Sequence, residues 1–149
     1  EMGNQEEALP LYEEALAAQR ETLGDRHPDT LNSINAMAVF FRDKGDYAKS
    51  HRLYEEVVAV ACETLGDRHP RNLLYRNGMA RLFHKEGNLE ESRLLFEEVL
   101  ATRREVFGDQ HSNTATSMKG LLEVFREIGD EDEANKLEAE LSRICTKGI

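Results

Sequence analysis

The hexapeptide Leu-Gly-Asp-Arg-His-Pro stands at residues 23–28 and again at residues 65–70, and a third version, Phe-Gly-Asp-Gln-His-Ser, follows at residues 107–112. Each copy begins 42 residues after the one before it. A second series, Gly3, Gly45, Gly87 and Gly129, keeps the same step. A fixed period of this length indicates stacked structural repeats that each pack against their neighbours. The sequence therefore directs the search for function to a surface repeated along an array, and not to a single pocket.

Glycines divide each 42-residue unit into two amphipathic stretches. Apolar residues recur at helical spacing from Leu31 to Phe41, and again from Leu53 to Ala61. Pro28 stands in the first turn of its stretch, where the missing N–H of proline does no harm. Gly45 follows the last residue of that stretch, a position where a left-handed residue usually ends a helix. Both stretches are therefore predicted to be helices.

The repeat predicts seven helices of two kinds. The first kind, the A helices, is expected near residues 28–44, 70–86 and 112–128. The second kind, the B helices, is expected near residues 4–23, 46–65, 88–107 and 130–146. No stretch alternates as a β-strand would, so the predicted fold is all-α: a solenoid of stacked antiparallel helix pairs. The units 3–44, 45–86 and 87–128 are expected to form a single array over residues 1–149.

The last B helix differs from the others at two large apolar positions. Tyr54 and Phe96 are replaced there by Glu138, and the position of Leu100 becomes Ser142. Polar residues on a face that would otherwise meet another repeat are typical of a capping helix. We therefore expect residues 129–147 to close the array. The chain begins with Glu1 and not with Met, which indicates a fragment of a longer protein.

Bulk composition excludes several classes of protein. The net charge is −10, whereas a nucleic-acid-binding protein needs a basic face to neutralise phosphates. No run of 18 apolar residues could span a membrane, and the acidic start does not resemble a signal peptide. The two cysteines, Cys62 and Cys145, lie about two repeats apart, which fits reduced thiols better than a disulfide framework. A cytoplasmic protein that neither binds nucleic acid nor inserts into a membrane is expected.

Three segments of this sequence together resemble the tetratricopeptide repeats of kinesin light chains, which also have 42 residues. They are Ala-Leu-Pro-Leu-Tyr-Glu-Glu-Ala-Leu at residues 8–16, Leu-Gly-Asp-Arg-His-Pro-Asp-Thr at residues 23–30, and Asp-Lys-Gly-Asp-Tyr at residues 43–47. Similar repeats occur in nephrocystin-like proteins and in the sensor regions of nucleotide-binding signalling proteins. The resemblance implies a tetratricopeptide superhelix whose A helices line a concave groove for extended peptides.

The resemblance also implies which residues face that groove. They are Asn32, Asn35, Ala36, Val39 and Arg42 in the first unit, Leu74, Asn77, Gly78, Arg81 and His84 in the second, and Thr116, Lys119, Gly120, Glu123 and Arg126 in the third. The family usually carries two adjacent asparagines in this helix. Here the first is kept as Asn35 and Asn77 but is Lys119 in the third unit, and the second is absent throughout.

The charge of the A helices points to the kind of ligand. Segments 30–44, 72–86 and 114–128 hold seven Lys or Arg against four Asp or Glu, a balance of +3, so the rest of the chain carries −13. Basic residues on the presumed concave layer of an acidic protein would attract a peptide that is acidic or mixed in charge. The alternative is that these are solvated charges on exposed helix faces, where ion pairs contribute little.

Other repeated polar residues are better explained by structure than by chemistry. His27, His69 and His111 recur once per unit, but equivalent positions in stacked repeats lie about 8–10 Å apart, too far to share one metal ion. Each histidine is therefore expected to bond the backbone of its turn. Adjacent glutamates such as Glu13 and Glu14 point about 100° apart on a helix and do not form a catalytic pair. No catalytic, cofactor or metal site is predicted.

Two functions remain open from the sequence. The first is a non-enzymatic binding module, a scaffold that holds a peptide segment of a protein partner in the groove. The second is a structural or autoregulatory arm of a larger nucleotide-binding signalling protein, without a free ligand of its own. A phosphate-binding loop upstream in the full-length protein would favour the second, and upstream coiled-coil heptads would favour a motor adaptor.

Overall fold

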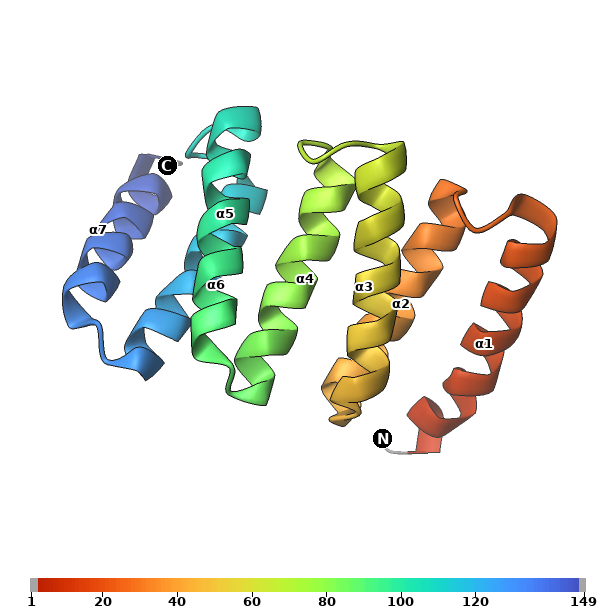
Figure 1. Ribbon diagram of the computed structural model, residues 1–149. Helices are drawn as coiled ribbons and strands as arrows, with labels where there is room; N and C mark the ends of the chain where they lie inside the picture. Colours follow the sequence, from red (N-terminus) through yellow and green to blue (C-terminus); the bar gives the residue numbers. More distant parts are fainter. Residues whose placement is uncertain (1–2, 148–149) are drawn as a thin grey trace. The chain divides into compact units, whose positions relative to one another are not determined.

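A computed structural model describes residues 3–147, with the side chains described from Glu7 onward. That part of the chain consists of seven α-helices and contains no strand (Figure 1). The helices are α1 (Gly3–Leu23), α2 (Pro28–Lys44), α3 (Tyr47–Thr64), α4 (Pro70–Glu86), α5 (Leu89–Phe107), α6 (Ser112–Ile128) and α7 (Glu131–Lys147). The A helices of the sequence are thus α2, α4 and α6, and the B helices are α1, α3, α5 and α7.

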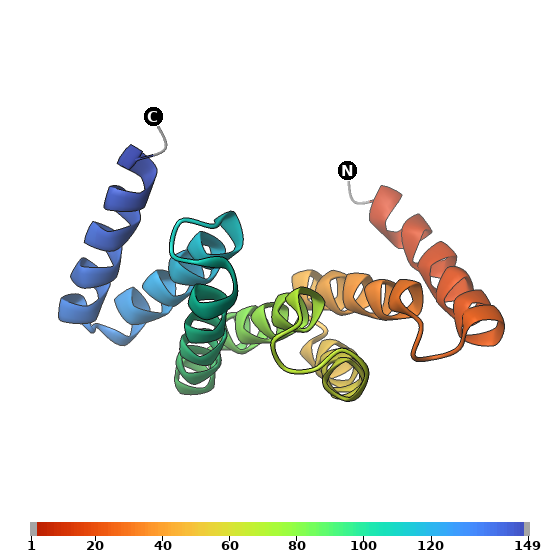
Figure 2. The same cartoon turned by 90° about the horizontal axis from the view of Figure 1, so that it is seen from above.

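The chain forms two compact units, Glu1–Gly66 and Asp67–Ile149. In the first unit α2 packs against both α1 and α3. In the second unit α5 packs between α4 and α6, α6 packs against α7, and α4 also contacts α6. Within each unit, successive helices run in opposite directions (Figures 1 and 2). The expectation that residues 1–149 form a single array, closed by the helix at 129–147, stays a prediction.

Each A helix begins at a histidine that caps its N-terminus. The Nδ1 atom of His27 accepts a hydrogen bond from the backbone N–H of Asp29, 3.1 Å away. His69 and His111 bond Arg71 and Asn113 in the same way, also over 3.1 Å. The capping bond satisfies one of the N–H groups that every helix start leaves without an intrahelical partner. This confirms the structural role expected for the repeated histidines.

Each A helix ends at a glycine in the left-handed conformation. Gly45 has φ 83°, and its N–H donates to the carbonyl of Arg42 over 3.1 Å. The next residue, Asp46, caps the start of α3, since its Oδ1 accepts from the N–H of Lys49. This backbone hydrogen bond holds the pKa of Asp46 below its usual value. Two adjacent residues therefore end one helix and start the next.

Small residues let A and B helices approach closely within each pair. The buried hydroxyl of Ser50 in α3 donates to the carbonyl of Ala38 in α2 over 2.7 Å. Ser92 in α5 makes the equivalent bond to Ala80 in α4 over 2.8 Å. A serine can reach a helix backbone only when the two helices lie close together, so the same small residue shortens the gap and joins the pair.

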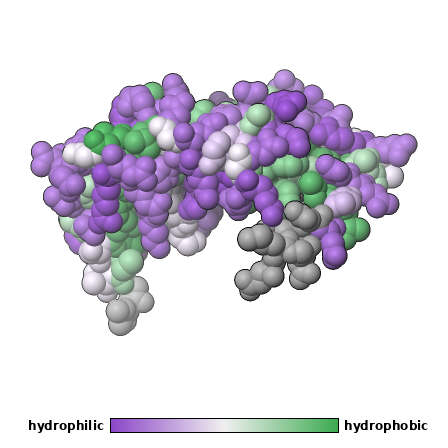
Figure 3. Space-filling model, turned by 90° about the horizontal axis from the view of Figure 1, so that it is seen from below, coloured by the Kyte–Doolittle hydropathy of each residue, from purple (hydrophilic) through white to green (hydrophobic). Residues whose placement is uncertain are grey.

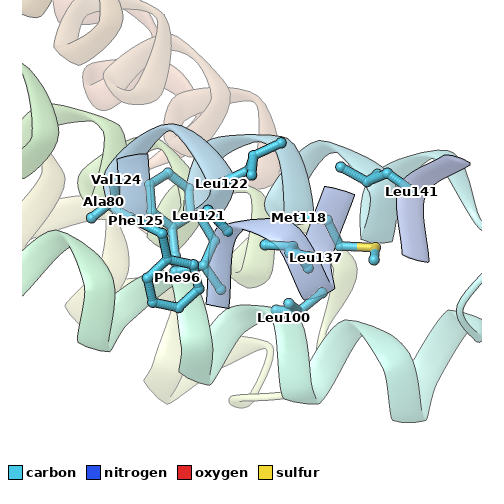
Figure 4. Packing of buried hydrophobic residues seen from close by; sticks show 11 residues of the cluster. Ala80, Phe96, Leu100, Met118, Leu121, Leu122, Val124, Phe125, Leu137 and Leu141 are labelled. Carbon is cyan, nitrogen blue, oxygen red and sulfur yellow. The ribbon is translucent and has the colours of Figure 1, made fainter. Parts of the chain in front are cut away.

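The core of the second unit is built around Phe96, which is fully buried (Figure 4). Its ring packs with apolar side chains from α4, α6 and α7, among them Ala80, Leu121 and Phe125. The ring also lies over Gly120 of α6, where a Cβ atom would come within 2.5 Å of Phe96 Cζ. Glycine is therefore required at this position for α5 and α6 to pack.

Helix α7 has one apolar face and one polar face. Ala134, Leu137 and Leu141 are buried against the rest of the second unit. Glu138 and Ser142, which replace large apolar residues of earlier repeats, are exposed. Glu138 forms an ion pair with Arg126 of α6 over 2.7 Å. The polar substitutions of the last unit thus lie on the solvent-facing side of α7, as their repeat position predicts.

Candidate functional site

The candidate site is the face of the A helices that carries the predicted groove residues, called here the A-face. It is described separately for each unit, and its residues lie on α2 between Asn32 and Arg42, on α4 between Leu74 and His84, and on α6 between Thr116 and Arg126. In the first unit it lies on α2, where Asn32 is exposed and Asn35 and Val39 are half-buried. The side chain of Arg42 is only 10% exposed, because its guanidinium contacts Asp43 and the hydroxyl of Tyr54. This part of the A-face is therefore mostly polar, with the apolar residues Val39 and the exposed Ala36, and its arginine is already engaged.

In the second unit the A-face is formed by α4 and α6, which contact each other. Six of the residues predicted to line the groove are exposed there: Leu74, Arg81, Thr116, Lys119, Glu123 and Arg126. Oε2 of Glu123 lies 3.9 Å from Nδ1 of His84. Leu74 is half exposed and is one of several large apolar side chains on the surface of the described region. The hydroxyl of Thr116 donates to the carbonyl of Ser112 and so is directed at its own helix.

Asn77 differs from its predicted role as a groove contact, because it is only 4% exposed. Its Oδ1 accepts a hydrogen bond from the hydroxyl of Ser117 over 2.9 Å and lies 3.4 Å from Nη1 of Arg103. Asn77 therefore ties α4 to α5 and α6 beneath the A-face. Of the other predicted residues, Gly120 is buried under Phe96 and His84 bonds Glu127 of α6 over 2.9 Å.

Arg103 is a buried charged residue beneath the A-face that the sequence did not reveal. It lies on α5, is 1% exposed, and donates from Nη1 to the carbonyl of Asn113 and the hydroxyl of Ser117, over 2.7 and 2.8 Å. Burial, with a smaller effect of Arg81, lowers the pKa of Arg103 to about 10, so the guanidinium stays charged at neutral pH. A comparison of repeat positions could have found the cluster, since Gln19 and Ser33 of the first unit, which are hydrogen-bonded, correspond to Arg103 and Ser117.

The basic residues of the A helices are mostly paired. Arg42, Arg76, His84 and Arg126 each have a carboxylate within ion-pair distance. Lys44 lies over the ring of Phe40, 5.8 Å from its centroid. Arg81 and Lys119 are exposed and take part in none of the ion pairs or hydrogen bonds found among the described side chains. The excess positive charge noted in the sequence is therefore available to a ligand at these two residues.

Surface depressions lie on another side of the A helices, towards the B helices. In the second unit it is a hollow of about 350 Å³ that includes Glu97, Leu121, Phe125, Glu133, Lys136 and Leu137 in its lining. The first unit has a hollow of about 290 Å³ lined by the residues 84 positions earlier, Glu13, Met37, Phe41, Lys49, Arg52 and Leu53. On α6, Leu121 lies about 200° around the helix from Lys119. These two depressions, called here the B-side hollows because residues of the B helices also line them, are thus distinct from the A-face.

Comparison with known proteins identifies the class of fold. A family model described as "Tetratricopeptide repeat" matches residues 1–63, 35–105 and 70–147. The chain therefore belongs to the tetratricopeptide repeat family. A search of curated proteins finds no match.

Solved structures show the type of repeat. The chain is similar to nearly identical TPR-like repeats from a Podosopora anserina protein described as a candidate kinesin light chain, with 29% identity, a TM-score of 0.79, and coverage of 98% of this chain and 69% of that one. A variant of the same repeats gives a TM-score of 0.82 at 29% identity and the same coverage. BtubC (BKLC) from P. vanneervenii is 19% identical, with a TM-score of 0.87 over 97% of this chain and 58% of that one.

These findings confirm the predicted all-α fold of stacked helix pairs and the resemblance to kinesin light chain repeats. They support a protein-interaction scaffold, since proteins of this family present repeated helical surfaces to protein partners. Within the described residues, no helix is both long enough and apolar enough to cross a membrane. The same part of the chain holds no group of three His, Cys, Asp or Glu side chains that could bind a metal ion.

Proposed function

We propose that this chain is a non-enzymatic binding module whose A-face holds an extended segment of a protein partner, acidic or mixed in charge. The observation that carries the proposal is the pair of exposed cations Arg81 and Lys119, which have no carboxylate partner although the chain as a whole is strongly acidic. The exposed Leu74 on the same pair of helices supplies an apolar contact. Complementary charge accelerates association, and apolar contact adds affinity.

The proposal assigns each unit its own contact surface. In the second unit the contacts are Leu74, Arg81, His84, Thr116, Lys119 and Arg126, with Asn77 supporting them from below. In the first unit the contacts are Asn32, Asn35, Val39 and Arg42 of α2. The proposed partner is a protein and not a nucleic acid, because a net charge of −10 repels phosphates. The binding needs no cofactor, and we place it in the cytoplasm, where the thiols of Cys62 and Cys145, which form no disulfide, stay reduced.

Peptide selection with matched charge variants tests the proposal. Peptides would be selected on the intact chain from a displayed library of random dodecapeptides, and their dissociation constants measured by fluorescence anisotropy. The double variant Arg81→Ser/Lys119→Ser is expected to weaken the selected peptides at least about tenfold, which corresponds to about 1.4 kcal/mol. Circular dichroism should show unchanged helicity, since both residues are exposed.

The control variant is Arg68→Ser/Lys136→Ser, which removes two exposed cations of the same unit away from the A-face. It should leave the affinity of the selected peptides unchanged. Lys136 also lines the B-side hollow of this unit. If the control variant weakened binding and the Arg81/Lys119 variant did not, the peptides would occupy the B-side hollow and the A-face assignment would be wrong.

A further inference from the structure

Arg103 is the only charged side chain that is buried in the part of the chain that the structure describes. Its three hydrogen-bond acceptors are neutral oxygens, on Asn77, Asn113 and Ser117. Its Nε is buried and has no hydrogen-bond partner. No ion pair joins Arg103 to a described carboxylate. The second unit therefore contains a positive charge beneath its surface that no negative charge in the described region compensates. Burial of such a charge is costly.

The buried charge lies directly beneath the A-face. Asn77 and Ser117, which Arg103 contacts, belong to the two helices that form that face. Arg81 lies one helical turn after Asn77 on α4 and is close enough to Arg103 to lower its pKa. The exposed guanidinium and the buried one therefore add their potentials at the same place. A charge below the surface is screened less by solvent and salt than an exposed one. The contribution of Arg103 to the potential at the A-face therefore persists at higher salt concentration.

We infer that the A-face above Asn77 and Ser117 is a subsite for a carboxylate, the side chain of an aspartate or glutamate in the bound peptide. Arg81 contacts the carboxylate, and Arg103 attracts it from below without touching it. The inference rests on the proposed function and adds to it a named position and a preferred group. Arg103 is on this account a specificity-determining residue: it favours an acidic side chain over the neutral amide of the same shape.

The repeats themselves supply the variant that separates charge from packing. Gln19 of the first unit occupies the repeat position of Arg103 and accepts a hydrogen bond from Ser33, the counterpart of Ser117. Arg103→Gln therefore leaves Ser117 a partner that this fold already accommodates, and it removes the charge. Arg103→Lys keeps a cation at the same position. Arg81→Gln removes the exposed charge without any change to the core.

The probes are two capped hexapeptides of equal size, Ac-(Ser-Glu)3-NH2 and Ac-(Ser-Gln)3-NH2, titrated into the isotope-labelled chain up to millimolar concentration. Backbone amide shifts in NMR spectra report where and how tightly each peptide binds. In the native chain the glutamate peptide should shift amides of α4 and α6 and bind about tenfold more tightly than the glutamine peptide. Arg103→Gln should remove most of this preference, and Arg103→Lys should retain it. Urea denaturation of each variant checks that it is folded.

Each contrary result overturns a different statement. No A-face shift with the glutamate peptide, or equal affinity for the two peptides, overturns the carboxylate subsite. A full preference retained by folded Arg103→Gln overturns the role of Arg103. If Arg103→Gln does not fold, Arg81→Gln decides: it must weaken the glutamate peptide alone, and an unchanged preference refutes the subsite. Library-selected peptides that depend on Arg81 and Lys119 but bind folded Arg103→Gln as tightly as the native chain would leave the proposed function intact, whereas selected peptides that never contact the A-face would overturn it.

Discussion

At the scale of single residues, the turns of this protein depend on a histidine used as a helix cap. Serine, threonine, aspartate and asparagine are the usual residues at that position, because a short oxygen side chain reaches the free N–H groups easily. His69 reaches the N–H of Arg71 with its Nδ1 atom instead. Only a ring nitrogen without a proton can accept that bond, so the cap fixes the proton of the neutral ring on Nε2.

Removal of the His69 cap should destabilise the second unit. His69→Ala leaves the N–H of Arg71 without its acceptor, and a lost N-cap costs about 1 kcal/mol. We expect the free energy of unfolding, measured by urea denaturation, to fall by about that amount. His69→Ser restores an acceptor of the usual kind and should recover most of the loss. Equal destabilisation by alanine and serine would show that the ring acts through its packing and not as a cap.

Gly120 should be intolerant of even the smallest side chain. The new Cβ of Gly120→Ala would lie 2.5 Å from Phe96 Cζ, the tip of a ring that is fully buried in the core. Overpacking of this kind typically costs about 1–3 kcal/mol, which should outweigh the gain in helix propensity. Thermal and urea unfolding measure the effect. The double variant Gly120→Ala/Phe96→Leu makes space for the methyl group and should be more stable than expected from the two single variants.

At the scale of helices, arginines connect B helices that belong to successive repeats of the same unit. Arg20 of α1 contacts Asp25 in the following turn and Glu56 on α3, both over 2.7 Å. Arg104 occupies the same repeat position in α5 and contacts Asp109 over 3.2 Å and Glu140 on α7 over 2.7 Å. A single side chain thus joins its own helix, the next turn and the next B helix.

Loss of the Arg104 contacts should loosen α7 selectively. Arg104→Met keeps the apolar stem but removes both ion pairs, which are partly exposed and should be worth about 0.5–1 kcal/mol in total. Amide hydrogen exchange in α7 should become faster, and the difference from the native chain should shrink at high salt. Arg93→Met is the control, because its partners Glu90 and Glu97 lie on its own helix α5. Equal effects of the two variants on α7 would contradict the proposed connection.

Much of the helical layout could be predicted from the sequence, because each boundary depends on nearby residues. The expected range 28–44 coincides with α2, whose ends are set by His27, Pro28 and Gly45. The expected start of α3 at residue 46 was one residue early, because Asp46 caps the helix from outside it. The burial of Asn77 could not be predicted in this way: its partner Arg103 is 26 residues away, on the helix that follows the next turn.

At the scale of the whole molecule, the charge distribution is uneven. Most of the surface seen in Figure 3 is hydrophilic and only interrupted by hydrophobic patches, as expected for a chain with a net charge of −10. Many basic side chains of the described region are paired with acids, in several cases on neighbouring helices. Arg81 and Lys119 stand apart because neither has a described carboxylate within ion-pair distance, although Glu123 lies one helical turn after Lys119 on α6. The charge of the chain as a whole therefore says little about the charge at its A-face.

Acid should destabilise both units. The pKa of Asp46 is lowered by the N–H of Lys49, and the pKa of Glu90 is lowered by its hydrogen bond to Arg93. A carboxyl whose pKa is lower in the folded state stabilises the fold above its unfolded pKa, and this contribution is lost as the pH falls through the folded pKa. We expect stability to decline below about pH 4.5, the region where carboxylates protonate.

The double variant Asp46→Asn/Glu90→Gln tests the origin of the decline. Asparagine keeps an oxygen that can cap α3, while neither new side chain titrates. Urea denaturation at a series of pH values should show a shallower loss of stability with acid than in the native chain. An unchanged slope would mean that other carboxylates carry the pH dependence.

The turns at His27, Gly45 and Asp46 are closed by their own residues, and this bears on how such a chain can change in length. The histidine, the glycine and the following cap of a repeat all bond atoms a few residues away. Duplication or deletion of a gene segment of 42 codons would therefore deliver complete turns, whatever codon it started from. The coding sequence can gain or lose peptide-contacting surface by recombination in whole steps, while the joints between helices need no fresh mutation.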